Sequence, residues 1–188
     1  RDLVRSRGLG DVYKRQGIIE AFLQNKLKVA LAAPTGRAAK RLGELCATEA
    51  STIHRMLGMT FNDQTGEVTF TKGEKEPLEA DALIVDETSM VDLSLMRALL
   101  AALRPGCRLV LVGDPDQLPS VGAGNVFAEL IGSGIVPVTV LDEIFRQSKD
   151  SLIAYNAKFI NEENSSLFYG PDFQFVKAEN QEEAAAQI

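Results

Sequence analysis

The sequence has little of several residue types, and each shortage limits what the protein can be. It contains no tryptophan, one histidine (His54) and two cysteines (Cys46 and Cys107). A histidine-rich metal site is therefore excluded, and the two cysteines lie in no metal-ligand spacing. We expect both thiols to be reduced and structural. No apolar run approaches the roughly 20 residues that span a bilayer, and no signal-peptide pattern is present, so we expect a soluble, cytoplasmic protein.

Positive charge is scarce overall but concentrated near the N-terminus. The formal net charge is −6, which argues weakly against a nucleic-acid binder. Residues 1–41 nevertheless carry ten Lys or Arg and three Asp or Glu, whereas the remainder carries ten and twenty-three. The N-terminal part can therefore present a local basic surface to phosphate groups.

Short apolar runs alternate with helical patterns along the 188 residues, a length sufficient for one domain with a real core. Four runs predict buried strands, at Val29–Ala33, Ala82–Asp86, Arg108–Gly113 and Val138–Leu141. Five segments predict helices, at Ile18–Asn25, Gly36–Cys46, Leu93–Leu103, Asn125–Leu130 and Leu152–Ile160. Continuous apolar runs are typical of strands covered on both faces, so the pattern predicts an α/β domain with a mainly parallel sheet flanked by helices.

Two segments depart from this alternation. Phe61–Thr71 contains turn residues between short apolar stretches and predicts a small β-hairpin insertion. Gly170–Pro171 predicts a break, followed by a strand at Phe173–Val176 and an acidic, alanine-rich helix start that runs to Ile188. We interpret this tail as the first part of a second domain.

Two carboxylates, Asp86 and Glu87, follow one predicted buried strand directly. In open α/β sheets, ligands bind at the carboxyl ends of the strands. The first acid is suited to Mg²⁺, held through water, and the second to orienting or deprotonating an attacking water. The alternative is a helix N-cap formed by Asp86 or Thr88. The dipeptide alone leaves both interpretations open.

The stretch GDPDQLPSVGAG, Gly113 to Gly124, follows the next predicted strand. Gln117 within it is a neutral group suited to sensing a phosphate or positioning a water. An ordinary loop is the alternative, because Gly, Pro and Asp dominate turns. Twelve such residues at the same end of the sheet as Asp86 exceed what a connection requires, which favours a functional loop.

Two further segments carry basic residues after predicted strands. In IFRQ, Arg146 is suited to a γ-phosphate, although pairing with a nearby acid is the better interpretation of that arginine alone. In APTGRAAKRL, Thr35 can cap a helix and offer a hydroxyl to a phosphate. The basic side chains that follow it suit a nucleic-acid backbone or an ordinary solvated face: Arg37, Lys40 and Arg41. In STIHR, the lone histidine, His54, is more often structural.

The ordered series APTGRAAKR, STIHR, LIVDETSMVD, GDPDQLPSVGAGNVF and IFRQ resembles RecD-type DNA helicases of superfamily 1, which include the alpha subunit of exodeoxyribonuclease V. The resemblance covers residues 17–188 and is far more specific than any single motif. It implies a RecA-like P-loop NTPase fold and an enzyme with two such domains. It also implies ATP hydrolysis in the cleft between the domains, and 5′ to 3′ movement on single-stranded DNA for recombination and repair.

The resemblance also implies residue roles. Asp86 would bind Mg²⁺, Glu87 would be the catalytic base, and Gln117 and Arg146 would contact the γ-phosphate of ATP. The residues expected to line the path of single-stranded DNA are Pro34, Thr35, Gly36, Arg37, Thr52 and His54. Expected partners are single-stranded DNA and other subunits of a recombination nuclease–helicase complex. We place the first RecA-like domain at residues 17–161 and the start of the second at 162–188.

The acids require a phosphate loop of the form G-x-x-x-x-G-K-S/T, and the sequence does not provide one. The nearest match, GLGDVYKR at Gly8 to Arg15, has Tyr13 in place of the second glycine and Arg15 in place of the hydroxyl. The preceding apolar strand is also missing, which predicts a gap between neighbouring strands. We interpret residues 1–16 as foreign to the domain, and expect this chain neither to bind ATP well nor to unwind DNA.

Other functions compete with this interpretation. The helicase part of a conjugative relaxase is the alternative within superfamily 1, although the form APTGRAAKR favours the RecD type. A non-catalytic module that binds single-stranded nucleic acid is the alternative from another class. A nucleotide kinase needs neither the GDPDQLP loop nor the basic APTGR turn.

Overall fold

The computed structural model describes residues 9–61, 63, 66–140, 151–161 and 163–186. The chain separates into two compact units: residues 10–61, 63 and 66–140 are the described part of the larger, and residues 9, 151–161 and 163–186 that of the smaller. Each unit is described by itself. The predicted domain boundary at 161/162 stays a prediction, although the helix that precedes it, α6 (Leu152–Asn161), belongs to the second compact unit.

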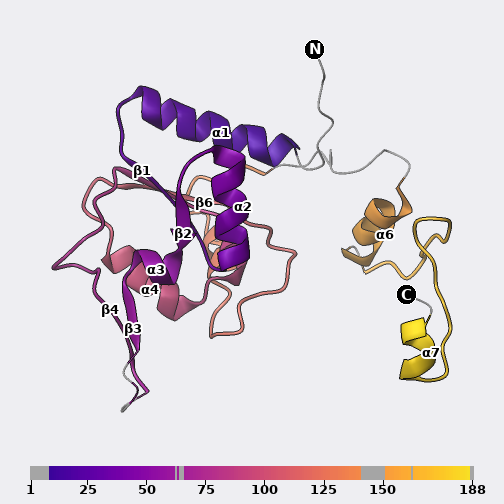
Figure 1. Cartoon of the computed structure of the whole chain (residues 1–188). Helices are drawn as coiled ribbons and strands as arrows, with labels where there is room; N and C mark the ends of the chain where they lie inside the picture. The colour runs from indigo at the N-terminus through magenta and orange to yellow at the C-terminus, as the bar shows by residue number, and fades with distance from the viewer. Residues whose placement is uncertain (1–8, 62, 64–65, 141–150, 162, 187–188) are drawn as a thin grey trace. The chain divides into compact units, whose positions relative to one another are not determined.

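The larger unit is built on a parallel sheet of four strands in the order β2-β1-β5-β6 (Figure 1). The strands are β1 (Val29–Ala33), β2 (Ala50–Thr52), β5 (Ala82–Val85) and β6 (Arg108–Leu111). Ala32 lies beside Val85, and Val85 beside Leu111. Because all four strands run the same way, their carboxyl ends meet at one edge of the sheet, as the predicted α/β fold requires.

Helices cover both faces of this sheet. On one face, α1 (Leu9–Gln24) and α2 (Gly36–Cys46) pack through Ile19 and Leu42 against Leu31 and Ile84. On the other face, α3 (Ile53–Met56) and α4 (Leu93–Ala101) pack against the alternate residues of the same strands. The buried side chains on that second face include Ile53, Leu57, Leu83, Val85, Leu95 and Leu99. Two buried layers explain why the strand sequences are continuously apolar.

Shorter elements complete the larger unit. The predicted hairpin is present as antiparallel β3 (Met59–Phe61) and β4 (Val68–Phe70). A 3-10 turn, η1 (Thr88–Met90), follows the acid pair, and α5 (Val126–Gly132) follows the long loop after β6. No helix within the described residues is long and apolar enough to cross a membrane.

The predicted fourth strand is wrong in its described part. Val138 and Val140 have no regular secondary structure, and they are 46% and 77% exposed. A β-branched run becomes a strand only where a neighbouring strand completes its hydrogen bonds, and β6 is the edge of the described sheet. Leu141, the last residue of that prediction, lies outside the described residues.

The N-terminal segment is helical where the structure describes it. Residues Leu9 to Gln16 form the first half of α1, and the Gln16 side chain donates to the Leu45 carbonyl on α2 over 2.6 Å. These residues therefore provide neither a strand nor a phosphate loop. The predicted gap is not found among the described strands, because the ladder from β2 to β6 is continuous.

The second unit contains α6 and α7 (Gln181–Ala186). Asn156 on α6 is fully buried, its amide donates to the Phe168 carbonyl over 2.6 Å, and its oxygen accepts from the Phe168 N–H. The strand predicted at Phe173–Val176 is wrong, because the structure has only an isolated bridge between Gly170 and Phe173. One bridge cannot support a strand without a partner segment.

Asp81 links neighbouring segments at the amino-terminal edge of the sheet through a hydrogen bond and an ion pair. The Asp81 carboxylate accepts from the Lys28 N–H over 2.7 Å and forms an ion pair with Arg104. These interactions, the Lys28 hydrogen bond first, lower the pKa of Asp81 below its ordinary value of 3.8. Beside it, burial raises the pKa of the Cys107 thiol, which fits a structural cysteine.

Asp81→Asn is expected to make unfolding less dependent on acidic pH. Because the native pKa of Asp81 is depressed, its ionised form stabilises the fold above the unfolded-state pKa, and that contribution is lost as pH falls through the native pKa. The native chain should therefore lose stability more steeply than Asp81→Asn below about pH 4. Urea unfolding at pH 3 and pH 7 measures this, and parallel losses in both proteins would contradict it.

Candidate nucleotide and nucleic-acid site

Four of the strand ends carry the polar residues singled out in the sequence. Pro34 and Thr35 follow β1, His54 follows β2, Asp86 follows β5, and the Gly113–Gly124 loop follows β6. Because the strands are parallel and hydrogen-bonded in register, these segments share one edge of the sheet. The structure thus brings the candidate phosphate-facing and DNA-facing residues to the same edge.

The acid pair Asp86 and Glu87 occupies an energetically unfavourable position at the end of β5. Asp86 is 6% exposed, and its N–H donates to the Ala32 carbonyl over 2.9 Å, which fixes it against β1. Glu87 has a left-handed backbone, φ 51°, in a residue that is not glycine. Such a conformation costs on the order of 1–3 kcal/mol and concentrates at functional sites. Burial of one acid and backbone strain in the next make this segment a candidate site.

The helix-cap interpretation of the acid pair is wrong for α4. Asp92 caps α4, since its side chain accepts from the Leu95 N–H over 2.7 Å. The Thr88 hydroxyl instead donates to the Val85 carbonyl over 3.1 Å, and Glu87 makes no side-chain cap bond to η1. Neither acid is therefore needed to begin the helix that follows.

Ser89 is a buried polar residue beside the acid pair that the sequence reasoning did not single out. It is 5% exposed, and its hydroxyl has no hydrogen-bond partner among the described residues. An unsatisfied buried hydroxyl costs about 1–3 kcal/mol. The segment Asp86–Ser89 therefore contains two unfavourable features: the left-handed backbone of Glu87 and the unpaired hydroxyl of Ser89. The motif DETS contains a small polar residue there, but its burial depends on packing that no local pattern reveals.

The loop after β6 presents Gln117 to solvent. The Gln117 N–H donates to the Asp114 carbonyl over 3.2 Å, and the Asp116 N–H donates to the Asp114 carboxylate over 3.1 Å. These bonds form a tight turn with an exposed glutamine side chain at the carboxyl edge of the sheet. The side chain is free to face a ligand there.

Two of the residues predicted to line the DNA path also begin helices. The Thr35 hydroxyl accepts from the Ala38 N–H over 3.2 Å, and the Thr52 hydroxyl accepts from the Arg55 N–H over 3.2 Å. Both hydroxyls therefore serve as N-caps of α2 and α3. His54 lies against Phe70, with ring centroids 6.3 Å apart, so part of its role is structural.

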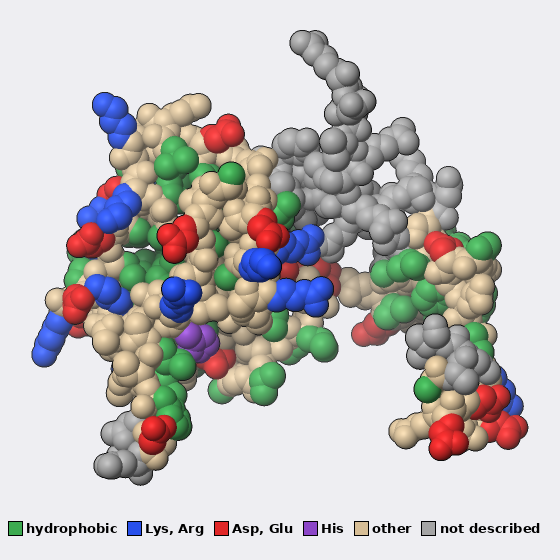
Figure 2. All heavy atoms as spheres, viewed as in Figure 1, with side chains coloured by type: hydrophobic (Ala, Val, Ile, Leu, Met, Phe, Trp, Pro, Cys, Tyr) green, Lys and Arg blue, Asp and Glu red, His purple; other side chains and the backbone are tan. Residues whose placement is uncertain are grey.

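Basic side chains are exposed around the same edge. On the face drawn in Figure 2, Lys and Arg side chains gather near one end of α2. The exposed basic residues of α2 are Arg37, Lys40 and Arg41, of which Lys40 lies 3.9 Å from Glu44. Exposed cations of this kind are suited to phosphate oxygens. Arg146, the other predicted γ-phosphate contact besides Gln117, lies outside the described residues.

The donor set fits a magnesium ion that is shared with phosphates. Mg²⁺ keeps several waters and binds proteins through one or two carboxylates together with substrate phosphates. Asp86 supplies one carboxylate at the strand end, and the described part of the chain has no cluster of three His, Cys, Asp or Glu. The site therefore suits a metal that arrives with a nucleotide, and does not form a site from protein ligands alone.

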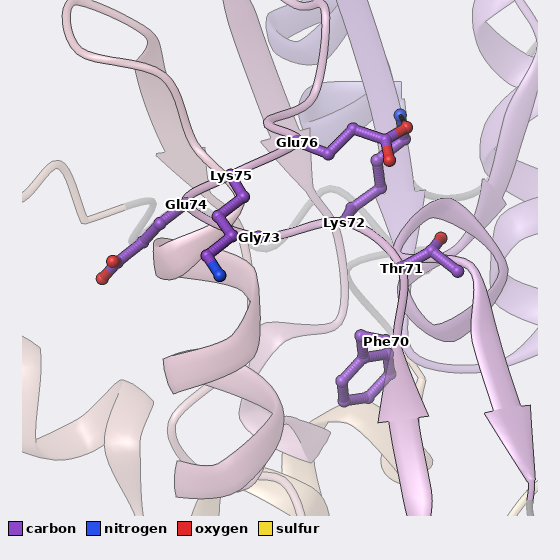
Figure 3. A pocket seen from close by; sticks show the side chains of 7 residues that line it. All are labelled: Phe70, Thr71, Lys72, Gly73, Glu74, Lys75 and Glu76. Atoms are coloured by element: carbon purple, nitrogen blue, oxygen red, sulfur yellow. Dashed lines mark hydrogen bonds and ion pairs between the residues drawn. The ribbon is translucent and has the colours of Figure 1, made fainter.

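A shallow depression lies elsewhere, on the segment after β4 (Figure 3). It has a volume of 370 Å³, and its lining includes Phe70, Thr71 and Lys72. The Lys72 ammonium is 2.6 Å from the Glu76 carboxylate, so its charge is already compensated. None of the candidate site residues at the carboxyl edge of the parallel sheet lines this depression, and we assign it no chemistry.

The comparisons with known proteins identify a family and several similar proteins. The AAA domain family matches residues 7–180. The ATP-dependent RecD2 DNA helicase of Deinococcus radiodurans is 47% identical over 122 residues, which cover 65% of this chain and 16% of that protein. The RecBCD enzyme subunit RecD of Mycolicibacterium smegmatis is 45% identical over 120 residues, which cover 55% of this chain and 21% of that protein. The chain thus spans only a small part of the curated relatives that it matches.

One solved structure supports the fold. A crystal structure of Bacteroides Pif1 in complex with ADP-AlF4 aligns with a TM-score of 0.51 at 22% identity, and covers 86% of this chain and 42% of that chain. The chain belongs to the AAA domain family. The motif series resembles that of RecD-type helicases of superfamily 1, and the similar proteins named RecD2 and RecD support this resemblance.

Proposed function

We propose that the chain is part of the motor of an ATP-dependent DNA helicase that moves 5′ to 3′ along single-stranded DNA in recombination and repair. The observation that carries the proposal is the shared sheet edge of Asp86, Glu87 and the Gln117 loop beside the basic turn at Arg37. The similar proteins, named RecD2 helicase and RecBCD subunit RecD, support it. Expected partners are single-stranded DNA and other subunits of a recombination complex.

Each strand-end residue has a chemical role in this proposal. Asp86 would hold Mg²⁺, which supplies charge neutralisation to the phosphates of ATP. Glu87 orients a water and accepts its proton, since a carboxylate within hydrogen-bond reach can act as a general base. The side-chain N–H of Gln117 would donate a hydrogen bond to the terminal phosphate, and the guanidinium of Arg146 would contact the same phosphate with a fixed positive charge.

A second candidate function applies to this chain as it stands. Leu9 to Gln16 are helical where a phosphate loop would be required, which favours a module that binds single-stranded nucleic acid without hydrolysing ATP. The basic turn after β1 would then serve alone. Binding of DNA is common to both functions, and hydrolysis separates them.

Arg37→Ala is expected to weaken binding of fluorescent single-stranded DNA several-fold for every base sequence. Loss of one phosphate contact should also reduce the slope of log affinity against log salt by about 0.7. Arg97→Ala is the matched control, because Arg97 is an exposed arginine on α4. Fluorescence anisotropy at several salt concentrations measures both variants, and equal weakening by the two would refute a DNA path along α2.

A further inference from the structure

The Gln117 loop is anchored to the segment that follows the acid pair. At the base of the loop, the Val112 carbonyl accepts from the Thr88 N–H over 2.9 Å, and a Cβ on Gly113 would lie 3.1 Å from the Ser89 nitrogen. At the far end of the loop, the Leu93 N–H donates to the Ala123 carbonyl over 3.0 Å, so both ends of the loop rest on one short stretch of chain.

Gly122 makes the closest approach in this arrangement. A Cβ at Gly122 would lie 2.7 Å from both Cβ and Cγ of Asp92, a separation that real carbon atoms do not adopt. Asp92 cannot easily move away, because its other carboxylate oxygen caps α4 through the Leu95 N–H. Only glycine therefore fits at position 122 while the loop stays in place.

The anchored part of the loop is also internally braced. The Ser120 hydroxyl lies 3.1 Å from the Gly122 carbonyl and 3.2 Å from the Gly124 carbonyl, and donates to this pair. Gly124 has φ 91°, a left-handed conformation that favours glycine. Ser120, Gly122 and Gly124 therefore form one braced segment, which lies three residues after Gln117.

We propose that Gly122 is a positioning residue: because it has no side chain, the Gln117 loop can pack directly on Asp92 and so against the segment that carries Asp86 and Glu87. The purpose of this contact rests on the proposed ATP hydrolysis, which requires the glutamine and the acids to face one triphosphate. The contact itself exists without nucleotide. It can therefore be tested in the chain as it stands.

Amide hydrogen exchange resolved by residue tests the contact in Gly122→Ala. The Leu93 amide is expected to exchange about ten-fold faster than in the native chain, and the Gln117 amide to accelerate with it. The Ala39 amide, which donates to the Thr35 carbonyl in α2, should keep its native rate. Gly73→Ala is the matched control, since Gly73 has open space around it and no left-handed backbone.

A paired substitution separates positioning from general loss of stability. Asp92→Gly removes the side chain that collides with Ala at position 122, and glycine is tolerated at an N-cap. The double variant Asp92→Gly/Gly122→Ala should therefore restore slow exchange at Leu93. If Gly122→Ala unfolds the whole domain, Ala39 will exchange rapidly as well, and Ser120→Ala then provides the comparison at Leu93 and Gln117.

Three outcomes would overturn the proposal. The first is a native exchange rate of the Leu93 amide in Gly122→Ala or, if that variant unfolds, in Ser120→Ala. The second is an equal acceleration of Leu93 exchange in Gly73→Ala. The third is that Leu93 exchange stays fast in the double variant. Failure of ATP hydrolysis in a chain with a restored phosphate loop would refute the proposed function, but would leave these exchange rates unchanged. The two hypotheses are therefore tested by separate measurements.

Discussion

Replacing Arg1–Gln16 with an apolar strand and a G-x-x-x-x-G-K-T loop is expected to raise the affinity for Mg·ATP about a thousand-fold, from millimolar to micromolar. The physical reason is that backbone N–H groups and the loop lysine hold the phosphates, while Asp86 supplies only one carboxylate. That difference corresponds to about 4 kcal/mol of binding free energy. Isothermal titration calorimetry with Mg·ATP measures it.

The same graft with Ala in place of the loop lysine is the matched control, and should recover little of the gain. Adding Glu87→Gln to the active graft should preserve binding while abolishing any hydrolysis, because the carboxylate is needed only for the attacking water. Micromolar binding by the native chain would contradict the prediction, since residues 9–16 are helical. Loss of nucleotide binding in Glu87→Gln would assign that residue to binding instead.

Local sequence signals predicted the exact bounds of one helix and the presence of several strands. The helix Gly36–Cys46 has the predicted bounds because its start is capped by Thr35 and its end adopts a left-handed residue at Ala47. Three of the four strands were predicted from continuous apolar runs, since burial on both faces is visible in composition. The strand β2, Ala50–Thr52, was missed because it is short and half-buried.

The errors arose where structure depends on a distant partner. Val138–Leu141 and Phe173–Val176 have strand-like sequences, but the described parts of these segments pair with no neighbouring strand. No local pattern indicates whether a partner strand is present, because its hydrogen bonds come from elsewhere in the chain. A sequence window therefore predicts the tendency of such a run, and only the assembled sheet decides its state.

In the candidate site, too, the sequence indicated some features, and others are visible only in the fold. Asp86, Glu87 and Gln117 were singled out because carboxylates and amides follow buried strands there, and the resemblance to RecD-type helicases supplied their proposed roles. The contact between Asp92 and Gly122 joins residues 30 positions apart, so it follows only from the way two loops pack. The fold thus contributes the mutual placement of the groups, while the sequence contributes their chemistry.

Leu99→Ala is expected to destabilise the larger unit by about 2–5 kcal/mol. Leu99 is fully buried on α4, in the core cluster that also contains Ile53, Leu57 and Leu83. Truncation removes apolar contacts and leaves a cavity that rigid strands cannot close. The free energy of unfolding of a domain is only about 5–15 kcal/mol, so this change removes a large share of it.

Leu100→Ala on the same helix is the matched control, because Leu100 is 51% exposed and its loss should change stability by about 0.5 kcal/mol or less. Urea unfolding should show a midpoint shift of about 1–2 M for Leu99→Ala and almost none for Leu100→Ala. Equal midpoints for the two variants would mean that α4 does not pack on the sheet. The acid segment that leads into α4 at Asp92 would then lack the support on which the proposed site depends.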